Sequence, residues 1–248
     1  MGKQRASRKS RDEGNSVVAI HSRYQEKNVD IAPDYKLDEF HPTEKQQEIV
    51  RSMILNDLTV ANGRAGTGKT STALWQALRM LKAGEFRKLI FLKNPTEVGD
   101  DQIGFLSGDK KDKLVAHFNS TKRIFAQFIS PGKLEADISS GKIELEIPNY
   151  ALGATWDNAI ILIDEGQLMS PETLKLLLER TGANSKVVIM GDVTQTYAVK
   201  KRENGLADLV RRLLDEEGEP IESFIGYVTL ESEDNMRSRL SQFITEIY

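Results

Sequence analysis

Residues 63–70 have the sequence Gly-Arg-Ala-Gly-Thr-Gly-Lys-Thr, and they restrict what this chain can fold into more than any other segment. Residues 58–61, just upstream, favour a strand, and the leucines spaced along 70–83 predict a helix that ends at Gly84. A strand, a glycine-rich turn and a helix start bring backbone N–H groups to one point, where the helix dipole also favours an anion. The segment therefore predicts an α/β unit with a phosphate-binding loop.

The run matches the pattern G-x-x-x-x-G-K-[ST], in which the positions have defined roles. Lys69 would reach the β- and γ-phosphates, and the Thr70 hydroxyl would bind Mg²⁺. An ordinary glycine-rich turn is the alternative, and the flanking strand and helix argue against it. The expected ligands are ATP or another nucleoside triphosphate, and Mg²⁺. The candidate nucleotide-binding residues of the loop are Gly63, Arg64, Ala65, Gly66, Thr67, Gly68, Lys69 and Thr70.

Length and composition allow one sizeable α/β domain. The chain has 248 residues, of which 39% are hydrophobic, and this is enough to bury a full core. It has no cysteine, which excludes disulfides and thiolate metal sites. Its longest apolar runs are of strand length, and no apolar signal segment opens it. We therefore expect a cytoplasmic protein without a membrane partner.

The amino-terminal residues differ from the rest of the chain in charge. Residues 1–11 contain five basic residues and no acid, and few apolar side chains occur before Val17. We expect residues 1–16 to form a disordered basic tail and residues 17–248 to form a single domain. Such a tail can bind nucleic acid electrostatically or simply be solvated. Because the net charge of the chain is −3, any nucleic-acid site within the domain would be a local patch.

Short apolar segments alternate with helical patterns along the chain. Strands are expected at about 58–61, 88–92, 142–147, 159–163, 186–190 and 221–229. Helices are expected at about 43–56, at 70–83, in a segment ending near 129, from 170 onward, at 205–215 and from 234. Uniformly apolar strands between helices indicate a parallel sheet with helices on both faces.

Two acids follow the apolar strand that ends at Ile163. Asp164 and Glu165 would lie at the carboxyl edge of the parallel sheet, where ligands of such sheets bind. Asp164 would hold Mg²⁺ directly or through water, and Glu165 would orient the attacking water and act as catalytic base. Two acids after a strand are commonplace alone, but about ninety residues after a complete phosphate loop they predict a hydrolysis site.

A further polar segment, residues 191–195, follows the next buried strand and has the sequence Gly-Asp-Val-Thr-Gln. The side chain of Gln195 can hydrogen-bond both a γ-phosphate and the attacking water. We therefore expect Gln195 to sense the γ-phosphate. Without the two preceding motifs, a simple Gly-Asp turn would be the better interpretation.

Together these segments resemble the PhoH-like P-loop ATPase family, a single-domain relative of superfamily 1 helicase motors. The resemblance extends over about 43–248, and its most discriminating element is Gly-Phe-Leu-Ser-Gly-Asp at 104–109. It implies a RecA-like P-loop NTPase fold and Mg²⁺-dependent ATP hydrolysis. It also implies a ring-shaped homo-oligomer, such as a hexamer, and a helicase-like role linked to RNA or single-stranded DNA.

Three further residues are assigned roles by their position in this resemblance. Gln46 stands where the family's adenine-recognising glutamine lies, and its amide can pair with N6 and N7 of adenine. The pattern Thr43-x-x-Gln46 is also a helix-capping box, and both roles can hold at once. Arg180 and Arg237 match family arginines, and either could be an arginine finger that reaches the γ-phosphate of a neighbouring subunit. A surface salt bridge is the alternative for one of them.

The chain also departs from the family at several positions. Asn94 replaces the arginine of an Arg-Pro pair, residues 152–155 replace an Arg-Gly-Arg-Thr run, Leu168 replaces an asparagine, and Ser238 replaces a histidine. The ATP-contacting motifs are retained while basic positions are lost. These departures bear on nucleic-acid binding and subunit contacts more than on ATP hydrolysis.

Lysines after the discriminating element offer a remaining nucleic-acid surface. Lys110, Lys111 and Lys113 could contact phosphates, and Phe105 could stack on a base. The alternative is that the lysines are solvated and that Phe105 belongs to the core.

Two functions of different classes are consistent with these motifs. The first is an ATPase stimulated by RNA or single-stranded DNA and assembled as a ring. The second is a module whose ATP state controls binding to a protein partner, without nucleic-acid activity. A small-molecule kinase is disfavoured, because the two acids and Gln195 indicate water as the acceptor.

Overall fold

The computed structural model describes residues 34–94, 121–148, 155–195 and 204–234, together with the isolated positions 119, 151, 153, 240 and 243. All of these residues belong to one compact unit, Pro33–Tyr248.

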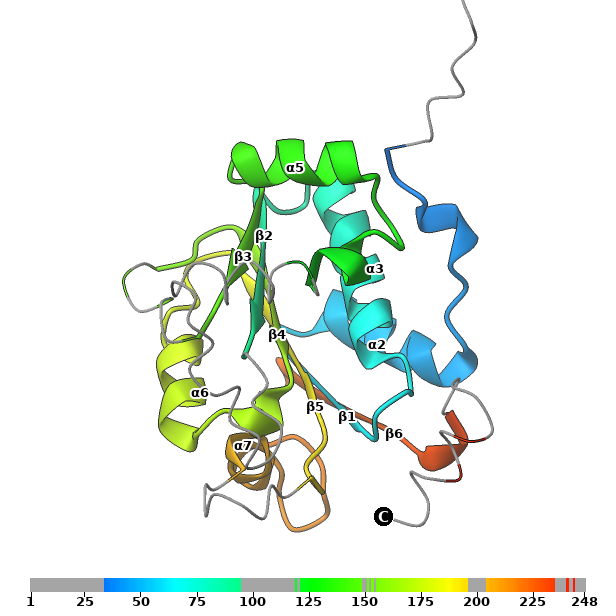
Figure 1. Cartoon of the computed structure of the whole chain (residues 1–248). Coiled ribbons are helices and arrows are strands. Elements are labelled where there is room, and N and C mark those ends of the chain that lie inside the picture. Colours follow the sequence, from blue (N-terminus) through cyan, green and yellow to red (C-terminus); the bar gives the residue numbers. More distant parts are fainter. Residues whose placement is uncertain are drawn as a thin grey trace, which may run out of the picture. The chain divides into compact units, whose positions relative to one another are not determined.

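Six parallel strands form one sheet in the order β3-β2-β4-β5-β1-β6 (Figure 1). The strands are β1 Leu58–Gly63, β2 Lys88–Lys93, β3 Ile143–Glu146, β4 Ala159–Asp164, β5 Lys186–Gly191 and β6 Ile225–Leu230. Strands β1 and β4, which precede the glycine-rich loop and the two acids, are separated by β5 alone. Because all strands run in the same direction, the functional segments that follow them meet at one edge of the sheet.

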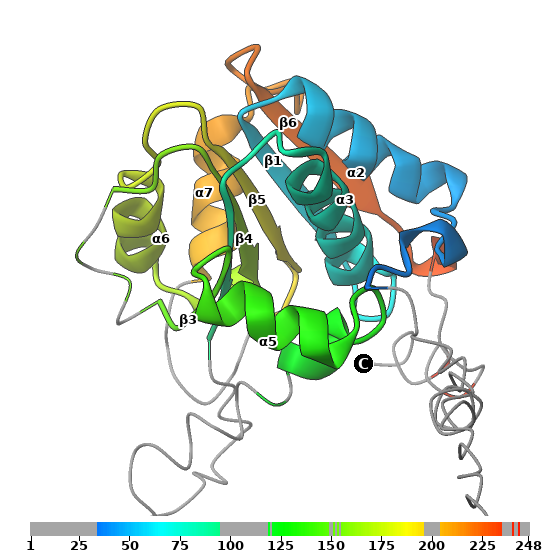
Figure 2. The ribbon, with the colours of Figure 1, turned by 90° about the horizontal axis from the view of Figure 1, so that it is seen from above.

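Helices cover both faces of this sheet, as Figure 2 shows from above. Helices α2 and α3 lie on one face, and α6 and α7 lie on the other. The helices are α2 Glu44–Leu55, α3 Lys69–Ala83, α5 Pro131–Ser139, α6 Pro171–Leu178 and α7 Gly205–Leu213, with short 3-10 turns η1 Leu37–Glu39, η2 Gly166–Leu168 and η3 Ser232–Asp234.

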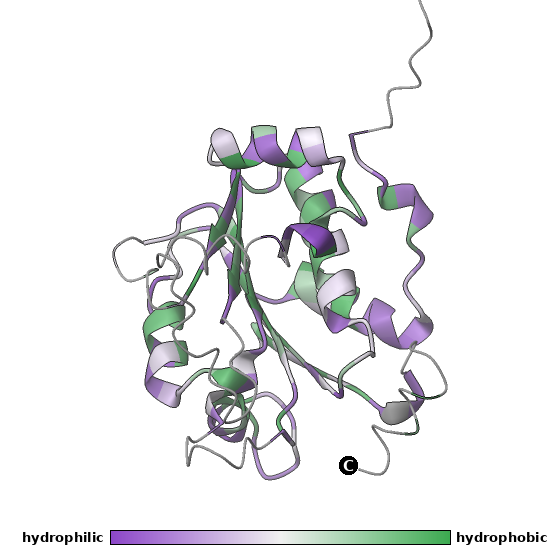
Figure 3. Cartoon of the chain, viewed as in Figure 1, coloured by the Kyte–Doolittle hydropathy of each residue, from purple (hydrophilic) through white to green (hydrophobic). Residues whose placement is uncertain are grey.

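Alternate residues of the strands supply the two cores. In β4, Ile160 and Leu162 belong to a core cluster with residues of α2 and α3, whereas Ile161 and Ile163 pack with Leu174 of α6. Figure 3 shows the hydrophobic colouring along the strands. The predicted α/β fold, with a parallel sheet covered on both faces, is confirmed.

Helix α5 is an element that the sequence-based expectation missed. Ser130 caps it by accepting a hydrogen bond from the Lys133 backbone N–H at 3.3 Å, and Pro131 occupies the first turn. The same Ser-Pro signal correctly predicted the start of α6 at Ser170. Only Leu134 and Asp137 of α5 are buried, so its apolar periodicity is too weak to be noticed without the cap.

Strand β6 begins at Ile225 rather than at residue 221, so the predicted strand starts too early. Ile221 is tied to the end of α7 by a hydrogen bond from its N–H to Leu213 O at 2.9 Å. The Ile225 N–H donates to Glu222 O at 3.1 Å, which closes a turn just before the strand. Ile221 and Phe224 are apolar and precede the strand, so the apolar pattern of the sequence begins before β6 does.

Candidate active site

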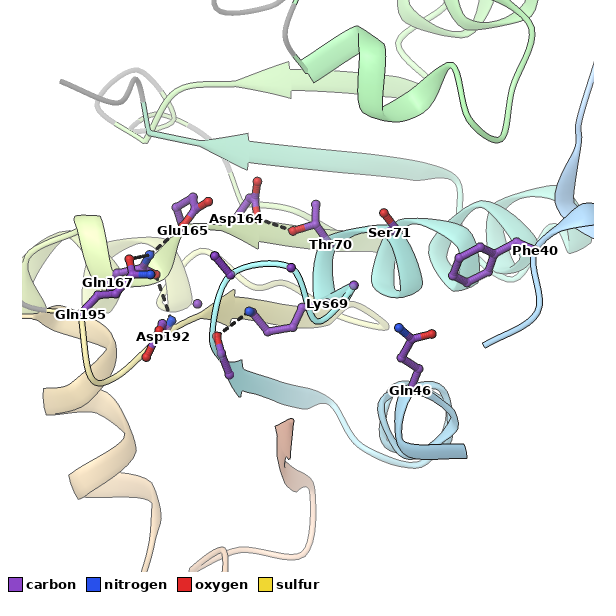
Figure 4. A pocket seen from close by; sticks show the side chains of 15 residues that line it. Phe40, Gln46, Lys69, Thr70, Ser71, Asp164, Glu165, Gln167, Asp192 and Gln195 are labelled. Carbon is purple, nitrogen blue, oxygen red and sulfur yellow. Dashed lines mark hydrogen bonds between the residues drawn. The ribbon is translucent and has the colours of Figure 1, made fainter. Parts of the chain in front are cut away.

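The carboxyl ends of β1, β4 and β5 enclose a cavity of about 340 Å³. Figure 4 shows the labelled side chains in a row, with Glu165 and Gln195 at one end, Lys69 and Thr70 in the middle, and Gln46 at the other end. The lining residues are Phe40, Gln46, Gly63, Ala65, Gly66, Gly68, Lys69, Thr70, Ser71, Asp164, Glu165, Gln167, Gly191, Asp192 and Gln195.

The glycine-rich loop is wrapped around the ammonium group of Lys69. Lys69 Nζ donates to the carbonyl oxygens of Gly63 at 2.5 Å and Arg64 at 2.8 Å, and it lies 3.4 Å from Thr67 Oγ1. Gly68, the N-cap of α3, has φ of 79°, a conformation that a side chain would strain. The amino terminus of α3 follows this loop directly, and the first turn of a helix is a place where backbone N–H groups can bind an anion.

Six of the eight loop residues predicted to bind nucleotide line the cavity, and Arg64 and Thr67 do not. Thr67 is fully buried, and its hydroxyl donates to Arg64 O at 3.0 Å. The hydrogen bond between these two residues holds the loop itself together. The sequence pattern could not show which loop residues have this role and which line the cavity.

The two predicted metal residues lie in direct contact. Thr70 Oγ1 donates to Asp164 Oδ1 at 2.8 Å, and the other carboxylate oxygen, Oδ2, accepts from Lys93 Nζ at 2.8 Å. Among the described residues there is no group of three or more His, Cys, Asp or Glu side chains suited to a metal. Mg²⁺ bound with a nucleotide needs fewer protein ligands, because phosphates and waters complete its octahedral shell. A hydroxyl and a carboxylate at hydrogen-bond distance fit that requirement.

Gln167 joins the expected base to the expected sensor. Its Nε2 group donates to Glu165 Oε2 at 2.6 Å and to Gln195 Oε1 at 3.0 Å, while its Oε1 accepts from the Asp192 N–H at 3.2 Å. Glu165 itself has a left-handed backbone with φ of 56°, which is rare for a non-glycine residue and typical of functional sites. A Cβ at Gly191 would collide with Gln167 Oε1, so this glycine leaves room for the amide.

The loop after β5 is held by two asparagines. Asn62 Oδ1 accepts from the Val193 N–H at 3.0 Å, and its Nδ2 donates to the Tyr227 hydroxyl of β6 at 3.1 Å. Asn204 Nδ2 donates to three carbonyls of the loop, among them Gln195 O at 3.1 Å. These contacts connect the loop after β5 to β1, to β6 and to the start of α7.

Gln46 forms the capping box of α2 and also touches the glycine-rich loop. Its Oε1 accepts from the Thr43 N–H at 3.1 Å, and its Nε2 donates to Thr67 O at 3.0 Å. Phe40 lines the same end of the cavity, and its ring packs edge-on against Phe128 with centroids 5.3 Å apart. No sequence pattern pointed to Phe40, because an isolated aromatic residue before a helix can serve many purposes.

Arg180 does not line this cavity. The carbonyl of Arg180 accepts from the Trp156 N–H at 2.8 Å, three positions before β4 starts, so this residue lies toward the amino ends of the strands. The predicted tail, 1–16, lies outside the described residues. So do Arg237, Phe105, Lys110, Lys111 and Lys113.

Several residues of the site were not assigned a role from the sequence. Gly191 and Asp192 belong to the segment 191–195, and Gln167 lies two positions after Glu165, so the signal that existed for them was their place within these motifs. Lys93 had no such sequence signal, because a lysine at the end of a strand is common.

Comparison with known proteins places most of the chain in one family. The family model described as PhoH-like protein matches residues 41–248. The chain is 33% identical over 206 residues to a PhoH-like protein of Synechocystis and 34% identical over 203 residues to one of Bacillus subtilis. These matches cover 83% and 82% of this chain but only 61% of each relative. Protein PhoH of Escherichia coli is 28% identical, and the match covers 56% of it. The chain thus spans about three fifths of the length of these relatives.

Solved structures give a weaker similarity. The SWI2/SNF2 ATPase core of Sulfolobus solfataricus in complex with dsDNA matches 77% of this chain and 45% of its own, with 12% identity and a TM-score of 0.42. The DUF1998 helicase MrfA bound to DNA matches 75% of this chain and 25% of its own, with the same identity and TM-score. In the part of the chain that the structure describes, no helix is long and apolar enough to cross a membrane.

Proposed function

The chain belongs to the PhoH-like protein family, and we propose that it hydrolyses ATP with Mg²⁺ in the cavity at the carboxyl edge of the sheet. The observation that carries this proposal is the placement of Lys69, Thr70, Asp164, Glu165 and Gln195 around one cavity. They come from segments far apart in the sequence, and each has a chemical use in phosphoryl transfer to water.

The geometry supports different roles for residues at different places along the cavity. Lys69 and the amino terminus of α3 bind the β- and γ-phosphates, and Thr70 and Asp164 are the residues that would hold Mg²⁺. When bound, the metal neutralises phosphate charge. Glu165 orients the attacking water and accepts its proton, and Gln195 donates an amide N–H to the γ-phosphate. Because Gln167 bonds both Glu165 and Gln195, it fixes the distance between base and sensor.

Gln46 and Phe40 support adenine binding at the opposite end of the cavity. The amide of Gln46 has one donor and one acceptor engaged by Thr67 and Thr43, and an amide of this kind can form further bonds to a base edge. The Phe40 ring can stack on the base.

Gln46→Glu is expected to weaken ATP binding by about tenfold, because the hydrogen bond from the amide to N7 of adenine is replaced by repulsion between a carboxylate and N7. A glutamate keeps the capping box, since its carboxylate still accepts from the Thr43 N–H. Competition of ATP with a fluorescent nucleotide measures the Kd. The exposed neighbour Gln47, changed to Glu, is the matched control. An unchanged Kd for ATP in Gln46→Glu would remove adenine recognition from this residue.

Nucleic-acid binding and ring assembly are proposed because the chain belongs to the PhoH-like family. We propose a ring in which Arg180 or Arg237 reaches the γ-phosphate of a neighbouring subunit. The position of Arg180 away from its own cavity is consistent with a role in trans. The basic residues at 110–113 and in the amino-terminal tail are the proposed contacts to RNA or single-stranded DNA.

Single-stranded RNA or DNA is expected to raise the steady-state rate of ATP hydrolysis several-fold at low salt, and added salt should reverse the effect because phosphate contacts are screened. Light scattering with and without ATP measures the oligomer in the same buffer. A monomer whose ATPase rate responds to no polynucleotide would leave the alternative function, a nucleotide-gated protein-interaction module. A protein partner captured only with a non-hydrolysable ATP analogue would then support that alternative.

A further inference from the structure

The ammonium group of Lys93 forms an ion pair with Asp164, the acid that is expected to hold the metal. It is the last residue of β2, and its register partner on β4 is Asp164. The two side chains form an ion pair with 2.8 Å between Nζ and Oδ2, and they are 17% and 4% exposed. An ion pair with one member so deeply buried is costly to break by removing the other member, because the remaining charge stays desolvated.

Each oxygen of the Asp164 carboxylate accepts a hydrogen bond. The P-loop hydroxyl of Thr70 donates to Oδ1, and the ammonium of Lys93 donates to Oδ2. A divalent cation at Thr70 would approach this ammonium closely. Two positive charges at short range repel each other strongly where water is excluded. Binding of Mg²⁺ is thus linked to the charge at position 93.

The backbone beside Lys93 is anchored. Asn94 Nδ2 donates to Leu168 O in η2 at 3.1 Å, so the end of β2 is tied to the turn that follows Asp164 and Glu165. Parallel pairing with β4 holds the strand up to Lys93 itself. A response of Lys93 to a metal is for this reason confined to its side chain.

We propose that Lys93 is a positioning residue that stands in for the metal at Asp164. Resting on the proposed function, this means that its ammonium keeps Asp164 and Thr70 in place before Mg²⁺ arrives and adds positive charge for the phosphates. Nucleotide binding then depends less on Mg²⁺ than it would with a neutral side chain at this position.

The test is the coupling between Mg²⁺ and nucleotide, measured as the Kd of a non-hydrolysable ATP analogue in EDTA divided by its Kd in Mg²⁺. Lys93→Met is expected to raise this ratio about tenfold, within the usual range of coupling between two sites. Lys93→Arg keeps the charge and is expected to keep the ratio. Lys88→Met is the matched control, because Lys88 lies on the same strand and pairs with Glu144 at 3.0 Å, outside the cavity lining.

The outcomes separate this inference from the proposed function. An unchanged ratio in Lys93→Met, with normal affinity in Mg²⁺, overturns the role of Lys93 and leaves the ATP site intact. No binding to the unaltered protein in either buffer overturns both. If thermal unfolding shows that Lys93→Met does not fold, Lys93→Gln provides the same test, because it removes the charge and retains a donor for Asp164. A raised ratio in Lys93→Gln supports the role of Lys93, and an unchanged ratio overturns it.

Discussion

Glu165→Gln is expected to lower kcat for ATP hydrolysis by about 10²–10⁴-fold, the range contributed by a general base, with ATP affinity nearly unchanged. An amide has the shape of the carboxylate and cannot accept the proton of the attacking water. Its oxygen can still accept from Gln167 Nε2, which donates to Glu165 Oε2 at 2.6 Å. The substitution therefore removes the base while retaining the local hydrogen bond.

Two measurements are needed for Glu165→Gln, because turnover and binding must be separated. Steady-state phosphate release gives kcat, and titration with a non-hydrolysable ATP analogue gives the Kd. Glu172→Gln is the matched control, since this glutamate is exposed in the first turn of α6 and does not line the cavity. If kcat of Glu165→Gln stayed within a few-fold of the unaltered protein, another group would have to activate the water.

Lys69→Ala is expected to weaken ATP binding by about 30-fold or more, which corresponds to roughly 2 kcal/mol, the lower limit for truncating one partner of a buried charge pair. Hydrolysis is expected to fall to background. The ammonium of Lys69 lies inside the loop, on the carbonyls of Gly63 and Arg64, where the phosphates are expected. No neighbouring backbone N–H can replace a full positive charge.

Lys82→Ala controls for the loss of a lysine from the same helix. Lys82 lies exposed in the last turn of α3, away from the cavity lining. Thermal unfolding of both variants without nucleotide separates a local effect from a loss of fold, because Lys69 also bonds the loop in that state. ATP binding that survives intact in Lys69→Ala would show that the nucleotide occupies another place.

Much of the fold was accessible from the sequence because its signals are local. The apolar strands, Gly84 after α3, and Ser170-Pro171 before α6 each act within a few residues. Helix α5 carried the same kind of signal at Ser130-Pro131 and was missed for lack of a strong apolar pattern. The early start assigned to β6 arose because local pattern cannot show which apolar residues of 221–229 pair with β1.

Some residues of the candidate site were likewise recognisable from local sequence, and others were not. The loop residues and the acids Asp164 and Glu165 were recognisable because each segment has a chemical pattern of its own. Phe40 and Lys93 were not, because each acquires its place only through partners distant in the chain. For Lys93 that partner is Asp164, seventy-one positions further on.

The sequence by itself determined that this chain has a P-loop pattern, two acids and a polar segment after apolar strands, because these depend on neighbours along the chain. Only the tertiary structure decided that Gln167 bonds both Glu165 and Gln195, that Gln46 touches the loop, and that Lys93 is paired with Asp164. These contacts arise where parallel strands are aligned side by side in register, and no single segment contains the information for that alignment.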